Sequence, residues 1–196
     1  MKKMKKITFA IIALFTFTFI GCKNDTKKEE DSSKEVVKEV VEEKVEVKEL
    51  GIVLEPKSGS TAEGKVIITE ENGEVTLAAS FYGLTPGTHA IHIHEKADCS
   101  AADGTSSGGH WNPTFAPHGK WGAEAGYHKG DIGNFEADEN GQGTISITTN
   151  EWCIGCGDEN KDILGKALIV HQGADDFTTQ PTGDAGGRVS CGGIIK

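Results

Sequence analysis

The chain has 196 residues and a formal net charge of −10, and it contains 26 glycines, 7 histidines and 5 cysteines. Such an acidic chain repels phosphate backbones, so its composition argues against nucleic acid as a partner. The first 50 residues differ sharply in composition from the rest, so only part of the chain is expected to form a packed core.

The N-terminal segment Met1–Gly21 has the features of an export signal. Four early lysines precede an apolar run from Ile7 to Ile20 that is too short to span a bilayer. The run ends in Phe-Ile-Gly-Cys22, which resembles the lipobox of bacterial lipoproteins, although Phe19 stands where leucine is usual. We therefore expect an exported protein, periplasmic or on the cell surface, whose lipidated Cys22 anchors it to a bacterial membrane. The alternative is an ordinary secretory signal with an incidental cysteine.

Residues 22–50 are expected to form a tether rather than a folded segment. Between Lys23 and Glu49 lie ten acidic residues, seven lysines and six valines, without any aromatic residue, glycine or proline. So few apolar side chains cannot bury a core, and a solvated spacer is the simplest interpretation. A coiled coil is the alternative, although the apolar spacing is irregular.

Residues 51–196 show the pattern of one all-β domain. Asn72-Gly73 is a strong signal for a two-residue hairpin turn. The expected strands are Lys65–Thr69, Glu74–Phe81, Thr88–Glu95, Gly133–Ala137, Gly143–Thr148, Leu164–Val170 and Val189–Ile195. Many short strands with glycine-rich turns indicate an antiparallel sandwich or barrel. Two long irregular stretches, Lys96–Gly130 and Gln172–Arg188, are expected to be functional loops.

Histidines are placed so that they can gather at a metal centre. His92 and His94 lie two apart in an expected strand and project from the same face, although such a pair alone is more often simply exposed. His171 closes another apolar run far downstream. Three further imidazoles and a carboxylate follow in the first long loop, at His110, His118, His128 and Asp131. This set suits four-coordinate zinc, and imidazole also suits copper.

With these motifs in view, the sequence resembles copper/zinc superoxide dismutase. The segments that carry the resemblance are His92–Glu95, Gly109–Pro113, His128–Asn134, Val170-His171 with Ala174–Asp176, and Ala185–Gly192. They span nearly all of residues 51–196 in the family order, and together they are highly specific. The resemblance implies an eight-stranded antiparallel Greek-key barrel or sandwich with two long functional loops. It also implies one copper and one zinc ion per subunit.

The resemblance assigns a role to each candidate site residue. Copper would be bound by His92, His94, His110 and His171. Zinc would be bound by His110, His118, His128 and Asp131, so that His110 bridges the two ions. Asp175 would tie a copper ligand to a zinc ligand through hydrogen bonds. His89, the seventh histidine, would be structural and lie beneath the site.

The resemblance also implies a disulfide, an anion guide and a reaction. Cys99 would pair with Cys191, and Arg188, the only arginine, would lie above copper and guide the anion. Copper would take an electron from one superoxide, which leaves as dioxygen, and pass it to a second, which leaves as hydrogen peroxide. His110 would take part by detaching from reduced copper and carrying a proton. A homodimer is compatible with the family, but the sequence does not place its face.

Several features depart from the family pattern. Ala90 and Ile91 stand where glycine and an aromatic residue are common, and the loop after His171 contains no lysine. Because loss of four lysines with the signal changes the net charge from −10 to −14, we expect association with superoxide to be slower than in the fastest members of the family. Cys153 and Cys156 form an insertion-like Cys-x-x-Cys motif. A local disulfide, a redox-active pair and half of a metal site are its three interpretations.

Two other functional classes compete with the enzyme. One is an exported module that binds copper and zinc without turnover. The other is a structural or adhesive surface lipoprotein, which would not need six converging histidines.

Overall fold

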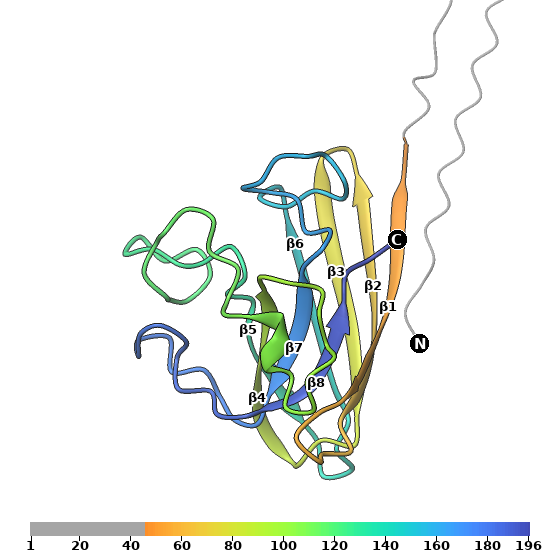
Figure 1. Cartoon of the computed structure of the whole chain (residues 1–196), viewed down its shortest axis with the longest axis vertical. Coiled ribbons are helices and arrows are strands. Elements are labelled where there is room, and N and C mark those ends of the chain that lie inside the picture. Colours follow the sequence, from red (N-terminus) through yellow and green to blue (C-terminus); the bar gives the residue numbers. More distant parts are fainter. Residues whose placement is uncertain (1–45) are drawn as a thin grey trace, which may run out of the picture. The chain divides into compact units, whose positions relative to one another are not determined.

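The computed structural model describes residues 46–196, which form a closed barrel of eight antiparallel strands (Figure 1). The expected signal peptide, the lipidation site Cys22 and nearly all of the expected tether lie outside the described residues. The strands are β1 Lys48–Pro56, β2 Glu63–Glu71, β3 Glu74–Tyr82, β4 Gly87–His94, β5 Gly133–Ala137, β6 Gly143–Thr149, β7 Ala167–His171 and β8 Arg188–Gly193. Within these residues, no helix is long and apolar enough to cross a bilayer.

The strand order around the barrel is β1-β2-β3-β6-β5-β4-β7-β8, and β8 pairs with β1 to close it. The chain therefore leaves β3 for β4 without pairing them, which is the crossover of a Greek key. The predicted eight-stranded all-β fold is confirmed. The hairpin is also confirmed, because Glu71 at the end of β2 pairs with Glu74 across Asn72-Gly73.

Alternation along the strands builds the barrel core. In β2, Val66 and Ile68 are fully buried between exposed or half-exposed neighbours, as the two-residue period of a strand requires. Phe81 of β3 stacks on Phe135 of β5, with ring centroids 4.6 Å apart. Gly64 leaves room for this stack, because a Cβ there would lie 2.8 Å from the Phe81 ring.

β1 was not among the expected strands. It begins at Lys48, three residues inside the stretch expected to be a tether. Its sequence KELGIVLEP buries only Ile52 and Leu54, so its charged start looks like the preceding segment. This segment is a strand because it pairs with β2 along its length, and its composition alone did not predict that pairing.

β4 and β7 are buried on both faces, which is unusual for a barrel strand. Their inward residues, such as Ile91 and Ile93, join the core. Their outward residues are covered by two long loops, 95–132 after β4 and 172–187 after β7, as expected. Ala90, one of the departures from the family pattern, is fully buried and donates its N–H to Gly173 of the second loop at 2.8 Å.

Two disulfides cross-link the described part of the chain. Cys99 in the first loop is bonded to Cys191 in β8, as predicted. Ala167, Ile169 and Cys191 form a small apolar cluster under this bond, on the outer face of the barrel. Cys153 and Cys156 are also bonded to each other, which favours the local disulfide among the three interpretations of that motif.

The two disulfides are expected to contribute unequally to stability. Cys99 and Cys191 are 92 residues apart, whereas Cys153 and Cys156 are three apart. Chain entropy then gives about 4.5 kcal/mol for the long loop and about 2 kcal/mol for the short one. Paired Cys→Ser variants, unfolded in guanidinium without reductant, should show this difference. Equal losses would show that loop closure does not govern stability here.

Candidate metal centre

The outer face of β4 positions the first group of histidines. His92 and His94 project from it with the two-residue period, while Ile91 and Ile93 face the core. His171, the last residue of β7, lies beside them because β4 and β7 are paired. An isolated β-bridge between His94 and His110 brings the first loop alongside. The resulting set is His92, His94, His110 and His171, all buried, with candidate ligand atoms within 4.8 Å of one another.

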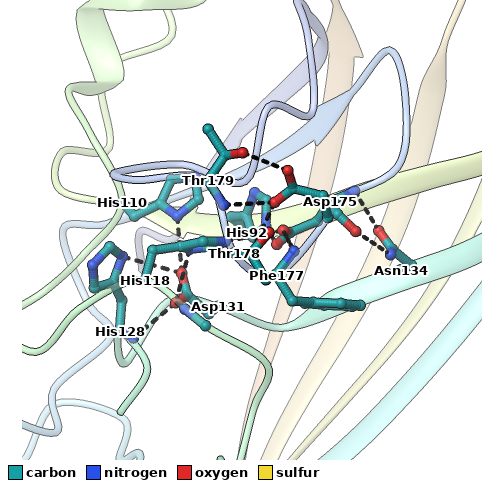
Figure 2. Close-up of polar contacts among 12 residues, drawn as sticks. His92, His110, His118, His128, Asp131, Asn134, Asp175, Phe177, Thr178 and Thr179 are labelled. Atoms are coloured by element: carbon teal, nitrogen blue, oxygen red, sulfur yellow. Dashed lines mark hydrogen bonds and ion pairs between the residues drawn. The ribbon is translucent and has the colours of Figure 1, made fainter. Parts of the chain in front are cut away.

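A second set shares His110 with the first. It comprises His110, His118, His128 and Asp131, again all buried and within 4.8 Å of one another. Asp131 is its centre (Figure 2), with Oδ1 2.9 Å from Nδ1 of His110 and 3.2 Å from Nδ1 of His128. Its other oxygen lies 3.0 Å from Nδ1 of His118 and accepts the backbone N–H of His128 at 2.8 Å. The structure thus brings together both ligand sets expected from the sequence.

Asp175 links the two sets, as the resemblance implied. Its Oδ2 accepts a hydrogen bond from Nε2 of His92 at 2.8 Å, and its Oδ1 accepts one from Nε2 of His118 at 2.9 Å (Figure 2). Both bonds leave the Nδ1 atoms of these rings free for an ion. A carboxylate in this position fixes the tautomer and orientation of each imidazole.

Two residues that the sequence analysis did not single out determine the placement of Asp175: Asn134 binds its backbone and Gly183 leaves room for its side chain. Asn134 of β5 exchanges two hydrogen bonds with the Asp175 backbone, at 2.8 and 2.9 Å. Gly183 has a φ of 69°, and a Cβ there would lie 1.9 Å from Asp175 Oδ1 and 2.6 Å from His118 Nε2. Only glycine therefore fits at this point of the second loop. Asn134 lies in a segment that carried the resemblance, whereas Gly183 gave no separate signal.

The side-chain chemistry fits two metal ions. Four buried nitrogens have no hydrogen-bond partner among the described residues: Nδ1 of His92, Nε2 of His110, Nδ1 of His118 and Nδ1 of His128. Burying a polar atom without a partner is costly, so an orphaned group requires an explanation. Each of these nitrogens belongs to an expected ligand. In His92, His110 and His118 the other ring nitrogen contacts a carboxylate, so the orphaned nitrogen is the one available to an ion. A bound ion on each side of His110 would satisfy all four.

The pKa values of the expected ligand histidines are shifted in two directions. Burial and neighbouring histidines lower the pKa of His110 to about 4 and that of His171 to about 3, and they lower the pKa of His94 still further. These rings are neutral at pH 7 and ready to bind an ion. The pKa of His118 is shifted in the opposite direction. Burial would lower it, but the carboxylates of Asp131 and Asp175, 3.0 and 2.9 Å from its two ring nitrogens, favour the protonated ring and raise its pKa to about 9.

Arg188, the first residue of β8, is fixed beside the first set. Its guanidinium donates to Gly104 O at 2.7 Å, to Ser107 Oγ at 2.9 Å and to Gly108 O at 2.8 Å. Gly108 O also accepts from Nδ1 of His94 at 2.9 Å, so one carbonyl joins the cation to a ring of the first set. The backbone of Arg188 pairs with His171 across a bulge.

His89 lies outside both sets, as expected. Its ring nitrogens are 2.8 Å from the carbonyl oxygens of His171 and Thr85. This places His89 beneath the site, where it braces the backbone of one expected copper ligand.

Comparison with known proteins identifies the family. Residues 62–194 match the family model described as copper/zinc superoxide dismutase. The chain belongs to the copper/zinc superoxide dismutase family. A copper/zinc superoxide dismutase of Caulobacter vibrioides is 39% identical over 137 residues, which cover 68% of this chain and 78% of that protein. A second one, from Aquifex aeolicus, is 34% identical over 134 residues, with 67% and 78% covered.

Solved structures agree in fold. The crystal structure of a SOD-like protein from Bacillus subtilis is 30% identical, with a TM-score of 0.65. The match covers 74% of this chain and 97% of that one. As a member of the superoxide dismutase family, the chain has the expected histidine clusters on the expected barrel.

Zinc uptake should release a proton from His118. Because the pKa of His118 in the metal-free protein is raised to about 9, its ring is protonated at pH 7.5 and must lose that proton to bind an ion. We expect about one more proton released per zinc at pH 7.5 than at pH 10. Calorimetry in buffers of different ionisation enthalpy measures this number. Equal release at both pH values would contradict the assignment of His118 as a ligand.

Proposed function

We propose that this protein is an active superoxide dismutase that converts two superoxide anions and two protons into dioxygen and hydrogen peroxide. The observation that carries the proposal is the arrangement of two buried ligand sets around one shared imidazole, His110, with the guanidinium of Arg188 fixed beside the first set. Copper would be held by His92, His94, His110 and His171. Zinc would be held by His110, His118, His128 and Asp131.

Copper supplies the one-electron redox change, and zinc, which has none, supplies a fixed charge. The rest follows from the side chains of the chain. His110 can serve both sets because Nδ1 faces Asp131 while Nε2 is buried and unpartnered. Nε2 of His110 is therefore the atom that would hold and deliver a proton when it is not bound to copper. Asp175 keeps His92 and His118 oriented throughout.

Arg188 is proposed to draw the anion to the site. Its charge is fixed by three hydrogen bonds to the first loop, and that loop is tied to β8 by the Cys99–Cys191 disulfide. A preorganised cation stabilises an incoming anion without a reorganisation cost. Because only Arg188 is assigned this task in an acidic chain, steering is expected to be weak overall.

The alternative function is an exported module that binds copper and zinc without turnover. It deserves a test because the solved relative from Bacillus subtilis is named only as SOD-like. The presence of Arg188 together with both complete ligand sets favours the enzyme. Dismutation by protein loaded with both metals separates the two functions.

The location remains a proposal from the sequence. We infer export and lipid anchoring through Cys22, supported by the basic start, the short apolar run and the lipobox-like end of that run. An extracytoplasmic location is compatible with the two disulfides, which persist in oxidising compartments.

His171→Ala should separate copper binding from folding. The change removes one of four copper ligands and none of the zinc ligands, so we expect zinc to be retained, copper to be lost and dismutation to fall at least about 100-fold. Metal analysis, the copper(II) electron paramagnetic resonance and an activity assay give the result. His89→Gln is the control, since it should lower stability but keep both metals. Full copper occupancy and activity in His171→Ala would show that the site is wrong.

Arg188→Ala should lower kcat/KM about tenfold at low ionic strength. Lys65→Ala, an exposed position on β2, changes the net charge by the same amount and should leave the rate within about twofold. Added salt should raise the rate of the wild type, because screening weakens the repulsion between superoxide and an acidic protein. A wild-type rate that falls with salt would indicate net attraction and contradict the expectation of weak steering.

A further inference from the structure

His128 differs from the other expected ligands in how its ring is held. Four of the other five rings have a hydrogen-bond partner outside the ligand sets, and His110 shares its two nitrogens between the sets. The four partners are Asp175 for His92 and His118, Gly108 O for His94 and Gly186 O for His171. Among the described residues, no hydrogen bond reaches the ring of His128, and Asp131 Oδ1 lies 3.2 Å from its Nδ1 without forming one. Since ligand histidines usually donate their second N–H to the protein, the orientation of this ring must come from its backbone and packing.

The residues on both sides of His128 are held by the segment that precedes the Cys-x-x-Cys motif. The carboxylate of Glu151 accepts the hydroxyl of Tyr127 at 2.6 Å with one oxygen and pairs with the ammonium of Lys129 through the other. The indole N–H of Trp152 donates to the backbone oxygen of Lys129 at 2.9 Å. Two consecutive residues therefore contact both neighbours of His128.

Aromatic packing reinforces these contacts. Trp152 is 1% exposed and belongs to the barrel core. The ring of Trp121, from the first loop, meets it edge-on at 5.2 Å and also contacts Tyr127 at 5.1 Å. The zinc-binding part of the first loop is thus packed against a side chain that cannot move without disturbing the core.

The segment that contains Glu151 and Trp152 is itself anchored away from the metal centre. The Cys153–Cys156 disulfide follows Trp152 directly, and Ile154 between them is 1% exposed. The Ile154 N–H donates to Glu70 Oε2 at 2.6 Å, and its oxygen accepts from Lys48 Nζ at 3.0 Å. These contacts tie the segment to β1 and β2 and not to the first loop.

We propose that Glu151 and Trp152 are positioning residues that fix the backbone around His128, and that they thereby slow the loss of zinc. The inference rests on the proposed zinc site at His110, His118, His128 and Asp131. It gives the segment around the Cys-x-x-Cys motif a role in that site: it is a rigid support for His128, the ligand of a single ion whose ring the protein does not hold directly.

Zinc release from Glu151→Gln and Trp152→Phe tests the proposal. Glutamine still accepts from Tyr127 but loses the charge that pairs with Lys129, and phenylalanine keeps the packing but loses the N–H. In each variant zinc should pass to a chromogenic chelator about tenfold faster than in the wild type. With cobalt(II) in place of zinc, the visible spectrum should broaden or shift, because the fourth ligand is less well oriented. Copper occupancy of the first set should not change.

Glu70→Gln is the matched control. It also removes a carboxylate that contacts the segment and pairs with a lysine, Lys48, but it does not touch the first loop. Glutamine at position 70 can still accept the Ile154 N–H, and the contacts of Glu151 and Trp152 with Tyr127 and Lys129 stay in place. Glu70→Gln should therefore shift the unfolding midpoint about as much as Glu151→Gln while leaving zinc release and the cobalt spectrum unchanged. Equal acceleration in Glu70→Gln would overturn the proposal, because general stability would then explain the effect. Wild-type release rates in both test variants would also overturn it, whereas failure of the wild type to take up zinc would overturn the proposed zinc site as well.

Discussion

Burial of six imidazoles and two carboxylates in one patch of the barrel surface is the constraint on which the rest of the structure depends. A ring that binds one ion is best held when its other nitrogen is satisfied within the protein, because an unpartnered buried nitrogen is costly. Asp175 meets this demand for two of the rings, and backbone oxygens of the two loops meet it for two more. The loops therefore do more than cover β4 and β7, since their irregular backbone supplies the acceptors that orient the histidines.

Long loops of this kind are held by cross-links because they lack the repeated hydrogen bonds of a strand. The first loop is bonded to β8 at Cys99, receives the guanidinium of Arg188 a few residues later, and packs on Trp152 at its far end. The second loop is tied to β5 through Asn134. Three of these cross-links start from strands, at Cys191, Arg188 and Asn134, and the fourth starts from Trp152 in the barrel core. The precision of the site therefore comes from the barrel, although most of its polar contacts lie in loops.

The sequence predicted those features that depend on local periodicity or on motif content. The two-residue period placed His92 and His94 on one face, and Asn72-Gly73 marked the hairpin. β1 escaped prediction because its charged start continues the composition of the preceding segment, and only its pairing with β2 defines it. Gly183 escaped because its role arises from a contact with Asp175 and His118 that exists only once both loops have folded over the barrel.

The fixed position of the Arg188 guanidinium is the feature that most clearly favours an enzyme over a module that only stores metal. Binding an ion requires only the ligand sets, and a nearby fixed cation would oppose the entry of another cation. Here the protein nevertheless half-buries its only arginine and uses three loop oxygens to hold its guanidinium next to His94. Burial lowers the pKa of Arg188 somewhat, but the group stays charged because its ordinary pKa is so high. A rigid positive charge at this place is useful to an anion that must reach the copper site, and it has no use in a module that only retains metal.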